Sequence, residues 1–298
     1  MMENGGMEKW CTKEWILTNR ARQKRRQRMA YSLIYAAAAL AVLVLVTIIG
    51  FIFVNGYKEL SWEFLSQGVK DAGREGGILP MMVNTLYLVG LGLLFAAPLS
   101  ILAAIYMTEY ARQGVLIKII RFFTTNLAGI PSIIFGLFGF MFFGRMLGWN
   151  WSLLNGSATV AVIILPTLIR TSEEALLTVP LGYKEGSLAM GATKWQTMYK
   201  VVIPAASPGI INGVILGMGR IVGETAALFF TLGSGTKIAT SLMDSARTLS
   251  LHLYTLAKEG LSVGKAYATA TVLIVIVLIL NLIAGAFGSR INRYKEQR

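Results

Sequence analysis

The stretch "GMGRIVGETAALFF" places two opposite charges, Arg220 and Glu224, four residues apart in an otherwise apolar segment. This spacing predicts that both side chains lie on one face of a helix. A charge inside a hydrophobic span is costly, and it usually faces a partner or an aqueous path. Two roles fit the pair. It is either a self-neutralised ion pair that fixes helix packing, or an anion path in which Arg220 offers its planar fork to a phosphate or carboxylate group. In the second role Glu224 holds the arginine until the anion arrives, and it can accept the proton of hydrogen phosphate.

A second candidate group is "RTSEEA", which begins at Arg170 near the end of another apolar segment. Arg170 is either an anchor on the cytoplasmic side of a membrane or a second residue lining the path. Glu173 and Glu174 are expected to open a cytoplasmic segment and to favour the N-terminus of a helix.

The elements that position these residues are predicted to be membrane-spanning helices. Of the 298 residues, 55% are hydrophobic and only 14% are charged, whereas soluble domains contain about 25% charged residues. About 20 helical residues cross a bilayer, so we expect an all-α polytopic membrane protein with six transmembrane helices. The third is expected to be bent or partly re-entrant, because it contains Pro131 and several glycines. The six spans are expected near residues 30–54, 81–107, 122–143, 153–179, 204–232 and 267–288.

The distribution of Lys and Arg predicts the orientation. Alternate segments, including both termini and the loop 180–204, carry 19 of the 28 basic residues, and the segments on the other side carry eight. The positive-inside rule therefore places both termini and this loop in the cytoplasm of a prokaryote, with the chain in its cytoplasmic membrane. The N-terminus is too long and too basic to be a cleavable signal peptide. The expected organisation is a basic tail 1–29, a first anchor 30–54, an extracytoplasmic loop 55–79, a main transmembrane domain 80–289 and a C-terminal tail 290–298.

Several function classes are disfavoured. The net charge of +13 comes mainly from basic residues at the termini and between the spans, a distribution that does not resemble a nucleic-acid-binding face. Cys11 and His252 are the only residues of their types, so zinc hydrolysis and Ser-His-Asp chemistry are not expected, and His252 is predicted to be a loop residue outside the membrane. The segment from Gly260 to Ala266 is one residue short of a P-loop and lacks the magnesium-binding Ser or Thr.

The loop 180–204 has the local signals of a helix, a sharp turn and a second helix. "YKEGSLAM" suits a short helix that ends at Gly191, because glycine accepts the left-handed conformation. Thr193 and Gln196 have the spacing of a capping box, which predicts a second helix to about Val202. Pro204 then opens the fifth span, where a missing N–H costs least. The loop is either an interfacial hairpin that links two spans or a docking element.

The spacing within this loop resembles a known motif. Glu185-Gly186-Ser187, three residues, Gly191, nine residues and Val201-x-Ile203-Pro204 resemble the EAA loop of type I ABC importer permeases, E-A-A-x3-G-x9-I-x-L-P. The departure is Gly-Ser in place of Ala-Ala. In that family the loop forms a coupling helix that docks on a separate ATP-binding subunit. The resemblance implies such contacts for six residues: Lys184, Glu185, Gly186, Leu188, Gly191 and Pro204.

The resemblance also implies partners and a cargo. R-x-x-G-E-T at Arg220–Thr225 is similar to the permease subunits of bacterial phosphate ABC transporters, in which Arg220 and Glu224 would be critical for transport, with Arg170 as a further candidate. The implied partners are a second, homologous permease subunit, two ATP-binding subunits and an extracytoplasmic phosphate-binding protein. The chain itself is expected to bind no cofactor and to catalyse no reaction, since ATP and Mg would bind the ATPase. A permease for sulfate or molybdate, and an ATP-independent secondary transporter or channel, remain as alternatives; a membrane enzyme is disfavoured, since no catalytic constellation is evident.

Overall fold

The computed structural model describes residues 13–111 and 114–296. The chain divides into two units, Met1–Val54 and Asn55–Arg298. Helix α1 (Lys13–Gly56) accounts for the described part of the first unit, and the helical stretch Arg26–Glu59 is long and apolar enough to cross a membrane. The predicted span 30–54 is therefore the apolar part of a longer helix. Residues 1–12 of the predicted tail lie outside the described residues.

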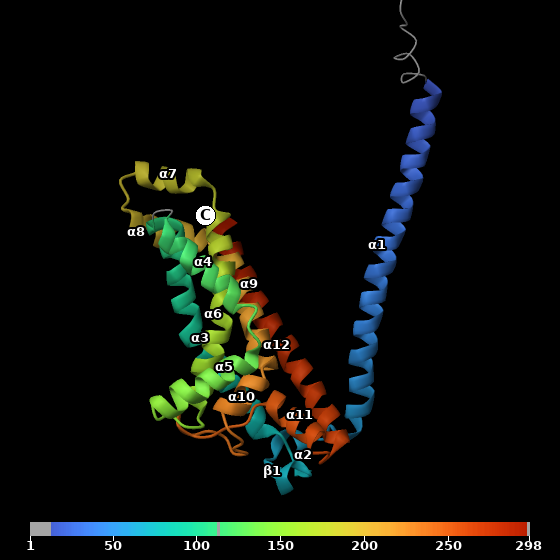
Figure 1. The fold of residues 1–298 in the computed structure, drawn as a ribbon, viewed down its shortest axis with the longest axis vertical. Helices are drawn as coiled ribbons and strands as arrows, with labels where there is room; N and C mark the ends of the chain where they lie inside the picture. The colour runs from blue at the N-terminus through green and yellow to red at the C-terminus, as the bar shows by residue number, and fades with distance from the viewer. Residues whose placement is uncertain (1–12, 112–113, 297–298) are drawn as a thin grey trace, which may run out of the picture. The chain divides into compact units, whose positions relative to one another are not determined.

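The second unit is a helical bundle in which α3, α6 and α9 pack at the centre. Leu88, Ile164 and Ile221, one from each of these helices, are almost completely buried. Figure 1 shows α7 and α8 at one end of this bundle and α2, α10 and α11 at the other, called here the α7 end and the α11 end. The confirmed all-α architecture consists of α2 (Trp62–Ser66), α3 (Leu79–Ile105), α4 (Val115–Leu127), α5 (Ser132–Gly139), α6 (Leu153–Leu177), α7 (Leu181–Ala189), α8 (Lys194–Thr197), α9 (Ile203–Gly223), α10 (Ala226–Thr231), α11 (Leu249–Lys258) and α12 (Val263–Glu296).

Short π-helical segments extend three of these helices. They follow α3 at Tyr106–Tyr110, α5 at Phe140–Met146 and α8 at Met198–Val202. The last one joins α8 to α9, so that Lys194–Gly223 is one continuous helical stretch of 30 residues. Pro204 lies in the first turn of α9, as predicted. The structure differs in that no break separates α9 from the helical residues before it.

The third span is bent, as its proline predicted. Helix α4 and the stretch Ser132–Met146 meet at 105° across a break that contains Pro131. Proline disfavours the helical conformation of the residue before it, which ends α4. The described residues thus contain five single helices able to cross a membrane, or up to six if this bent pair counts as one. The span begins at Val115 rather than near residue 122.

The fifth span is not one helix from 204 to 232 as expected. Helix α9 ends at Gly223, Glu224 has an extended backbone (φ −71°, ψ 130°), and α10 begins at Ala226. This break falls inside the motif that carries the candidate chemistry.

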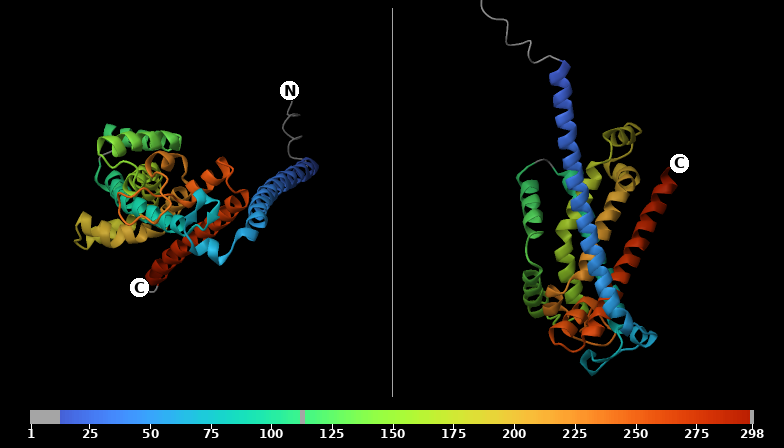
Figure 2. Two further views of the ribbon diagram at one scale, coloured as in Figure 1. Left: turned by 90° about the horizontal axis from the view of Figure 1, so that it is seen from below. Right: turned by 90° about the vertical axis from the view of Figure 1, so that its right-hand side faces the viewer.

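The α11 end has more structure than the predicted loop 55–79 suggested. It holds α2 and a small antiparallel hairpin of β1 (Val69–Lys70) and β2 (Glu75–Gly76), in which Val69 pairs with Gly76. Two views of the bundle show these elements beside α11 at the same end (Figures 1 and 2). Asn84 of α3 fixes the segment that follows α10, because its side chain donates to the Lys237 carbonyl and accepts from the Ala239 N–H, both at 3.0 Å.

His252 was predicted to be a loop residue, and the structure corrects this. It lies in α11 and is only 2% exposed. Burial, together with the charges of Arg247 and Lys265, lowers the pKa of its imidazole to about 4. The ring is therefore neutral at pH 7.

Candidate functional site

Arg220 lies in the last turn of α9, at the contact with α6. Its side chain is partly buried, and its Nη1 donates to Thr167 Oγ1 at 3.4 Å. In the described part of the chain, no carboxylate forms an ion pair with it within 4.0 Å. A guanidinium has five N–H donors, so most of those of Arg220 have no acceptor among the described residues. An arginine in this state is suited to bind an anion bidentately.

Glu224 does not share a helix face with Arg220, contrary to the prediction. Because α9 ends at Gly223, Glu224 is not part of that helix. Its carboxylate accepts hydrogen bonds from the backbone N–H groups of Thr225 (3.2 Å) and Ala227 (3.1 Å). These are N–H groups at the start of α10, which have no partner within the helix. Glu224 is 9% exposed, and its own carbonyl accepts from Ser250 Oγ at 2.7 Å. Its visible role is to stabilise the break.

Arg170 lies further along the face of α6 that contacts Arg220. Thr167 and Arg170 are three residues apart and therefore neighbours on the helix surface, with Arg170 closer to the α7 end. The Arg170 side chain is 71% exposed, and its Nε bonds Glu174 Oε1 at 3.0 Å. Thr167 thus contacts one predicted arginine and lies one helical turn from the other. Sequence reasoning missed this residue because an isolated Thr in a span gives no signal.

Glu173 and Glu174 lie within α6, not at the start of a new helix as expected. Glu173 instead forms an ion pair with Arg121 of α4. The helix continues past these residues because its apolar positions Ala175 and Leu176 are still packed in a core cluster. The pair Arg121–Glu173 therefore joins α4 to α6 near the α7 end.

The loop 180–204 has the predicted helix–turn–helix form. Helix α7 is followed by Gly191, which has a φ of +82°, and the reciprocal capping box between Thr193 and Gln196 starts α8. Both predictions are confirmed. Pro204 lies inside the continuous stretch that follows, at the start of α9.

Helix α7 is held to the bundle on one side and exposed on the other. Lys184 forms an ion pair with Glu109, and Ser187 Oγ lies 2.9 Å from Thr197 Oγ1 of α8. Glu185, Gly186 and Leu188 are exposed. Nothing lies within 4 Å of a Cβ added at Gly186, so an alanine would also fit at this position of the motif. Ser187, which replaces the second alanine of the motif, provides the contact with Thr197 of α8.

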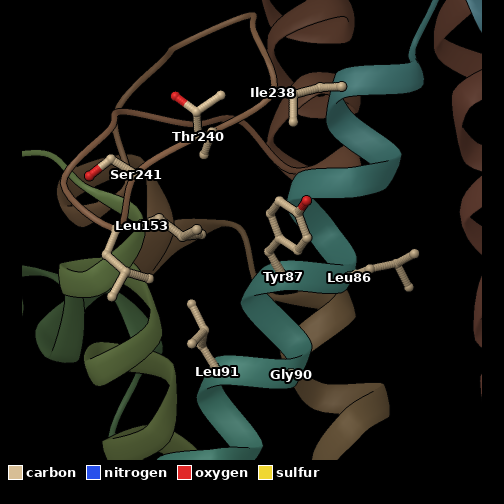
Figure 3. Close-up of a pocket in the computed structure, with 10 residues that line it drawn as sticks. Leu86, Tyr87, Gly90, Leu91, Leu153, Ile238, Thr240 and Ser241 are labelled. Carbon is tan, nitrogen blue, oxygen red and sulfur yellow. The ribbon is translucent and has the colours of Figure 1, made fainter.

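An apolar cavity is separate from these residues. Among the described cavities, one of about 590 Å³ lies between α3, the start of α6 and the loop 238–242. Figure 3 shows Tyr87 and Leu91 of α3 facing Leu153 and this loop. No charged side chain lines this cavity, so its chemistry does not suit an anion.

These features match those of known transport proteins. A family model described as "Binding-protein-dependent transport system inner membrane component" matches residues 96–293. The chain belongs to this family. The matched region contains Arg220, Glu224 and the whole α7 loop, so both candidate sites lie within the family domain.

Curated relatives of this inner membrane component share most of its length. The chain is 31% identical over 287 residues to the probable ABC transporter permease protein YqgI of Bacillus subtilis, covering 91% of this chain and 98% of that protein. It is 29% identical over 271 residues to the phosphate transport system permease protein PstA of Haemophilus influenzae, covering 89% of this chain and 94% of that protein. The chain is thus an ABC importer permease subunit.

Solved structures agree on the fold. A bacterial ABC transporter involved in the import of the acidic polysaccharide alginate contains a chain with a TM-score of 0.63 and 19% identity, covering 90% of this chain and 99% of that one. This similarity supports the fold. The cargo depends on individual side chains.

Proposed function

We propose that this permease subunit forms half of the translocation path of an ATP-driven importer of inorganic phosphate. The observation that carries the proposal is Arg220: a partly buried guanidinium in a membrane-spanning stretch, with Thr167 as its hydrogen-bond partner and no carboxylate in the described residues within 4.0 Å. An unpaired charge at such a depth is costly. A multiply charged oxyanion that passes this point would offset that cost and accept several N–H donors.

The relatives support phosphate over other oxyanions. The chain shares 29% identity with PstA across nearly the whole of both proteins, and it contains the R-x-x-G-E-T sequence at the break between α9 and α10. Sulfate and molybdate permeases remain the main alternative, because any tetrahedral oxyanion has the geometry that the arginine fork prefers.

Conformational changes of separate ATP-binding subunits would open and close the translocation path. We infer that the exposed surface of α7 and the turn after it docks on an ATPase in the cytoplasm, with contacts from Glu185, Gly186, Leu188 and Gly191. A helix fixed to the bundle at two positions transmits a displacement as a rigid body, which a flexible loop does not. A second permease subunit and an extracytoplasmic phosphate-binding protein would complete the importer. ATP hydrolysis would occur on the ATPase, and this chain would bind and release phosphate without forming a covalent bond.

The test is uptake of radiolabelled inorganic phosphate by proteoliposomes that contain the chain with its co-purifying subunits and binding protein. Arg220→Gln should reduce uptake at least 100-fold, and Arg220→Lys should retain partial activity because it keeps the charge but loses the fork. Arg145→Gln is the matched control, since Arg145 is exposed and lies over the Phe140 ring at 5.3 Å. Normal uptake by the Arg220→Gln complex would contradict the proposal.

Two further arms separate the alternatives. An excess of sulfate should not reduce phosphate uptake, and a strong reduction would favour a general oxyanion permease. Uptake should stop when the ATPase is omitted, whereas uptake that continues without it would favour a secondary transporter or a channel.

A further inference from the structure

A second arginine, Arg247, is buried at the α11 end of the bundle. It precedes Thr248, the N-cap residue of α11, and its side chain is 8% exposed. No carboxylate within the described residues forms an ion pair with it within 4.0 Å. Removing a charge from water costs several kcal/mol unless a partner compensates it. The position of Arg247 therefore calls for a compensating group.

The hydrogen bonds that Arg247 makes use only part of its capacity. Its Nη2 donates to the Ser234 carbonyl at 3.2 Å, and its Nη1 lies 3.5 Å from His252 Nδ1. Its Nε is buried and has no hydrogen-bond partner among the described residues. Since His252 is neutral at pH 7, it supplies no negative charge. Most of the five guanidinium donors are left for another acceptor.

A cavity of about 660 Å³ lies against Arg247. The hydroxyl-bearing residues Ser234, Ser245 and Thr255 line it, together with Trp151 and other aromatic residues. Its size falls within the range of small-ligand sites, which leaves room for a hydrated anion. Glu259 also lines the cavity. Burial lowers the pKa of Arg247 and the charge of Glu259 raises it, so Glu259 compensates the guanidinium in part from beyond ion-pair distance.

Helix α10 connects this cavity to the Arg220 region. Glu224 accepts from N–H groups at the start of α10, and the carbonyl of Ser234, just beyond its end, accepts from Arg247. Ser250 of α11 donates to the Glu224 carbonyl at 2.7 Å. Six helical residues span about 9 Å. The two unpaired arginines are thus associated with opposite ends of one short helix.

We propose that Arg247 and its cavity form a second oxyanion site, which holds a hydrated tetrahedral anion one short helix away from Arg220. This inference rests on the proposed function, because it assumes that the cargo is an anion. The site gives the anion a compensating cation at the α11 end of the bundle before or after it passes Arg220.

The test measures protection of a cysteine by inorganic phosphate in the full complex. Cys11 is the only cysteine, so Cys11→Ser followed by Ser234→Cys gives a single thiol beside the cavity. Its labelling rate with an uncharged maleimide is compared in phosphate, in sulfate and in chloride of equal ionic strength. Phosphate and sulfate should each slow labelling at least fivefold relative to chloride. Adding Arg247→Gln should abolish the effect, and adding Arg247→Lys should weaken it.

Two controls make the result specific. Lys258→Gln removes a cation at the same end, whose Nζ lies 5.6 Å from the Phe229 ring centre, and it should leave protection unchanged. Arg220→Gln should stop uptake but preserve protection, which separates failure of this site from failure of the proposed function. Equal protection with and without Arg247, loss of protection in the Lys258 variant, or no protection in any anion would overturn the proposal. If Arg247→Gln does not accumulate, Arg247→Lys with undiminished protection would overturn it as well.

Discussion

Lys184 of α7 forms an ion pair with Glu109, which lies 75 residues earlier at the end of the helix that continues α3. Both side chains are largely shielded, with 16% and 22% exposed, so salt screens the pair less than it would a surface pair. Lys184 was expected to contact an ATPase. Since it has an intrachain partner, we propose that it instead fixes the position of α7, and that Glu185 and Leu188 provide the docking contacts.

Lys184→Met should uncouple the importer without separating its subunits. The ATPase should still co-purify, because the exposed residues of α7 are intact, while phosphate uptake per ATP hydrolysed should fall about fivefold, which corresponds to ~1 kcal/mol for a partly shielded pair. The reversed pair, Lys184→Glu with Glu109→Lys, should recover most of the lost coupling. A single variant with an unchanged transport-to-hydrolysis ratio would show that the ion pair is not needed for coupling.

Glu224→Gln and Glu224→Ala should separate the two roles of this carboxylate. Glutamine keeps an oxygen that can accept from the N–H groups of Thr225 and Ala227, so its thermal stability should be close to that of the wild type. Alanine leaves these N–H groups without that acceptor, which should lower the free energy of unfolding by about 1–3 kcal/mol. Uptake should fall at least tenfold in both, because neither side chain is a carboxylate that can take the proton of hydrogen phosphate. Full uptake by the glutamine variant would limit Glu224 to its structural role.

Gly209→Ala should destabilise the contact between α6 and α9. A Cβ at this position would lie 2.5 Å from the Cβ of Ala175, which forces the two helices apart and should cost about 1–3 kcal/mol. Gly219→Ala on the same helix is the matched control, because nothing lies within 4 Å of its added Cβ. Thermal unfolding of the purified complex in detergent checks this, and equal melting temperatures for the two variants would argue against close packing at Gly209.

The stability of the α11 end should decrease in acid because of His252. Burial lowers its pKa from 6.5 to about 4, so the unfolded chain binds more protons than the folded chain between these values. The histidine's contribution is fully retained above pH 6.5 and is lost as the pH falls toward 4, by up to ~3 kcal/mol. The melting temperature at pH 5 and pH 7 measures this, with His252→Gln as the control. That variant should have a smaller difference between the two pH values, and an unchanged difference would assign the effect to other groups.

The sequence predicted the spans and the loop because both have strong local signals. Apolar stretches of sufficient length define spans, and the capping box at Thr193 and the glycine at 191 define a turn between helices. The bend at Pro131 followed for the same reason, since proline limits the backbone of its neighbours directly.

The break at Glu224 was not predictable from such signals. No proline lies among the ten residues before it, and a spacing of four residues is typical of two side chains on one helix face. The sequence therefore favoured a pairing of Glu224 with Arg220. The break is stabilised by tertiary contacts, including the bond from Ser250 to the Glu224 carbonyl, which comes from a segment 26 residues later. Arg247 was missed because a single arginine in a polar segment gives no sign of its burial.

The continuous stretch Lys194–Gly223 begins directly after the α7 turn and ends one turn beyond Arg220. At 1.5 Å per residue it is about 45 Å long. A single rigid helical element therefore connects the turn at Thr193 to the break after Gly223. Because the backbone at Glu224 is extended, α10 is not part of this helix and need not rotate with it. A small tilt of this helix at the α7 end would therefore displace the guanidinium of Arg220 and leave Arg247 in place. The distance between the two guanidinium groups would then change during the transport cycle.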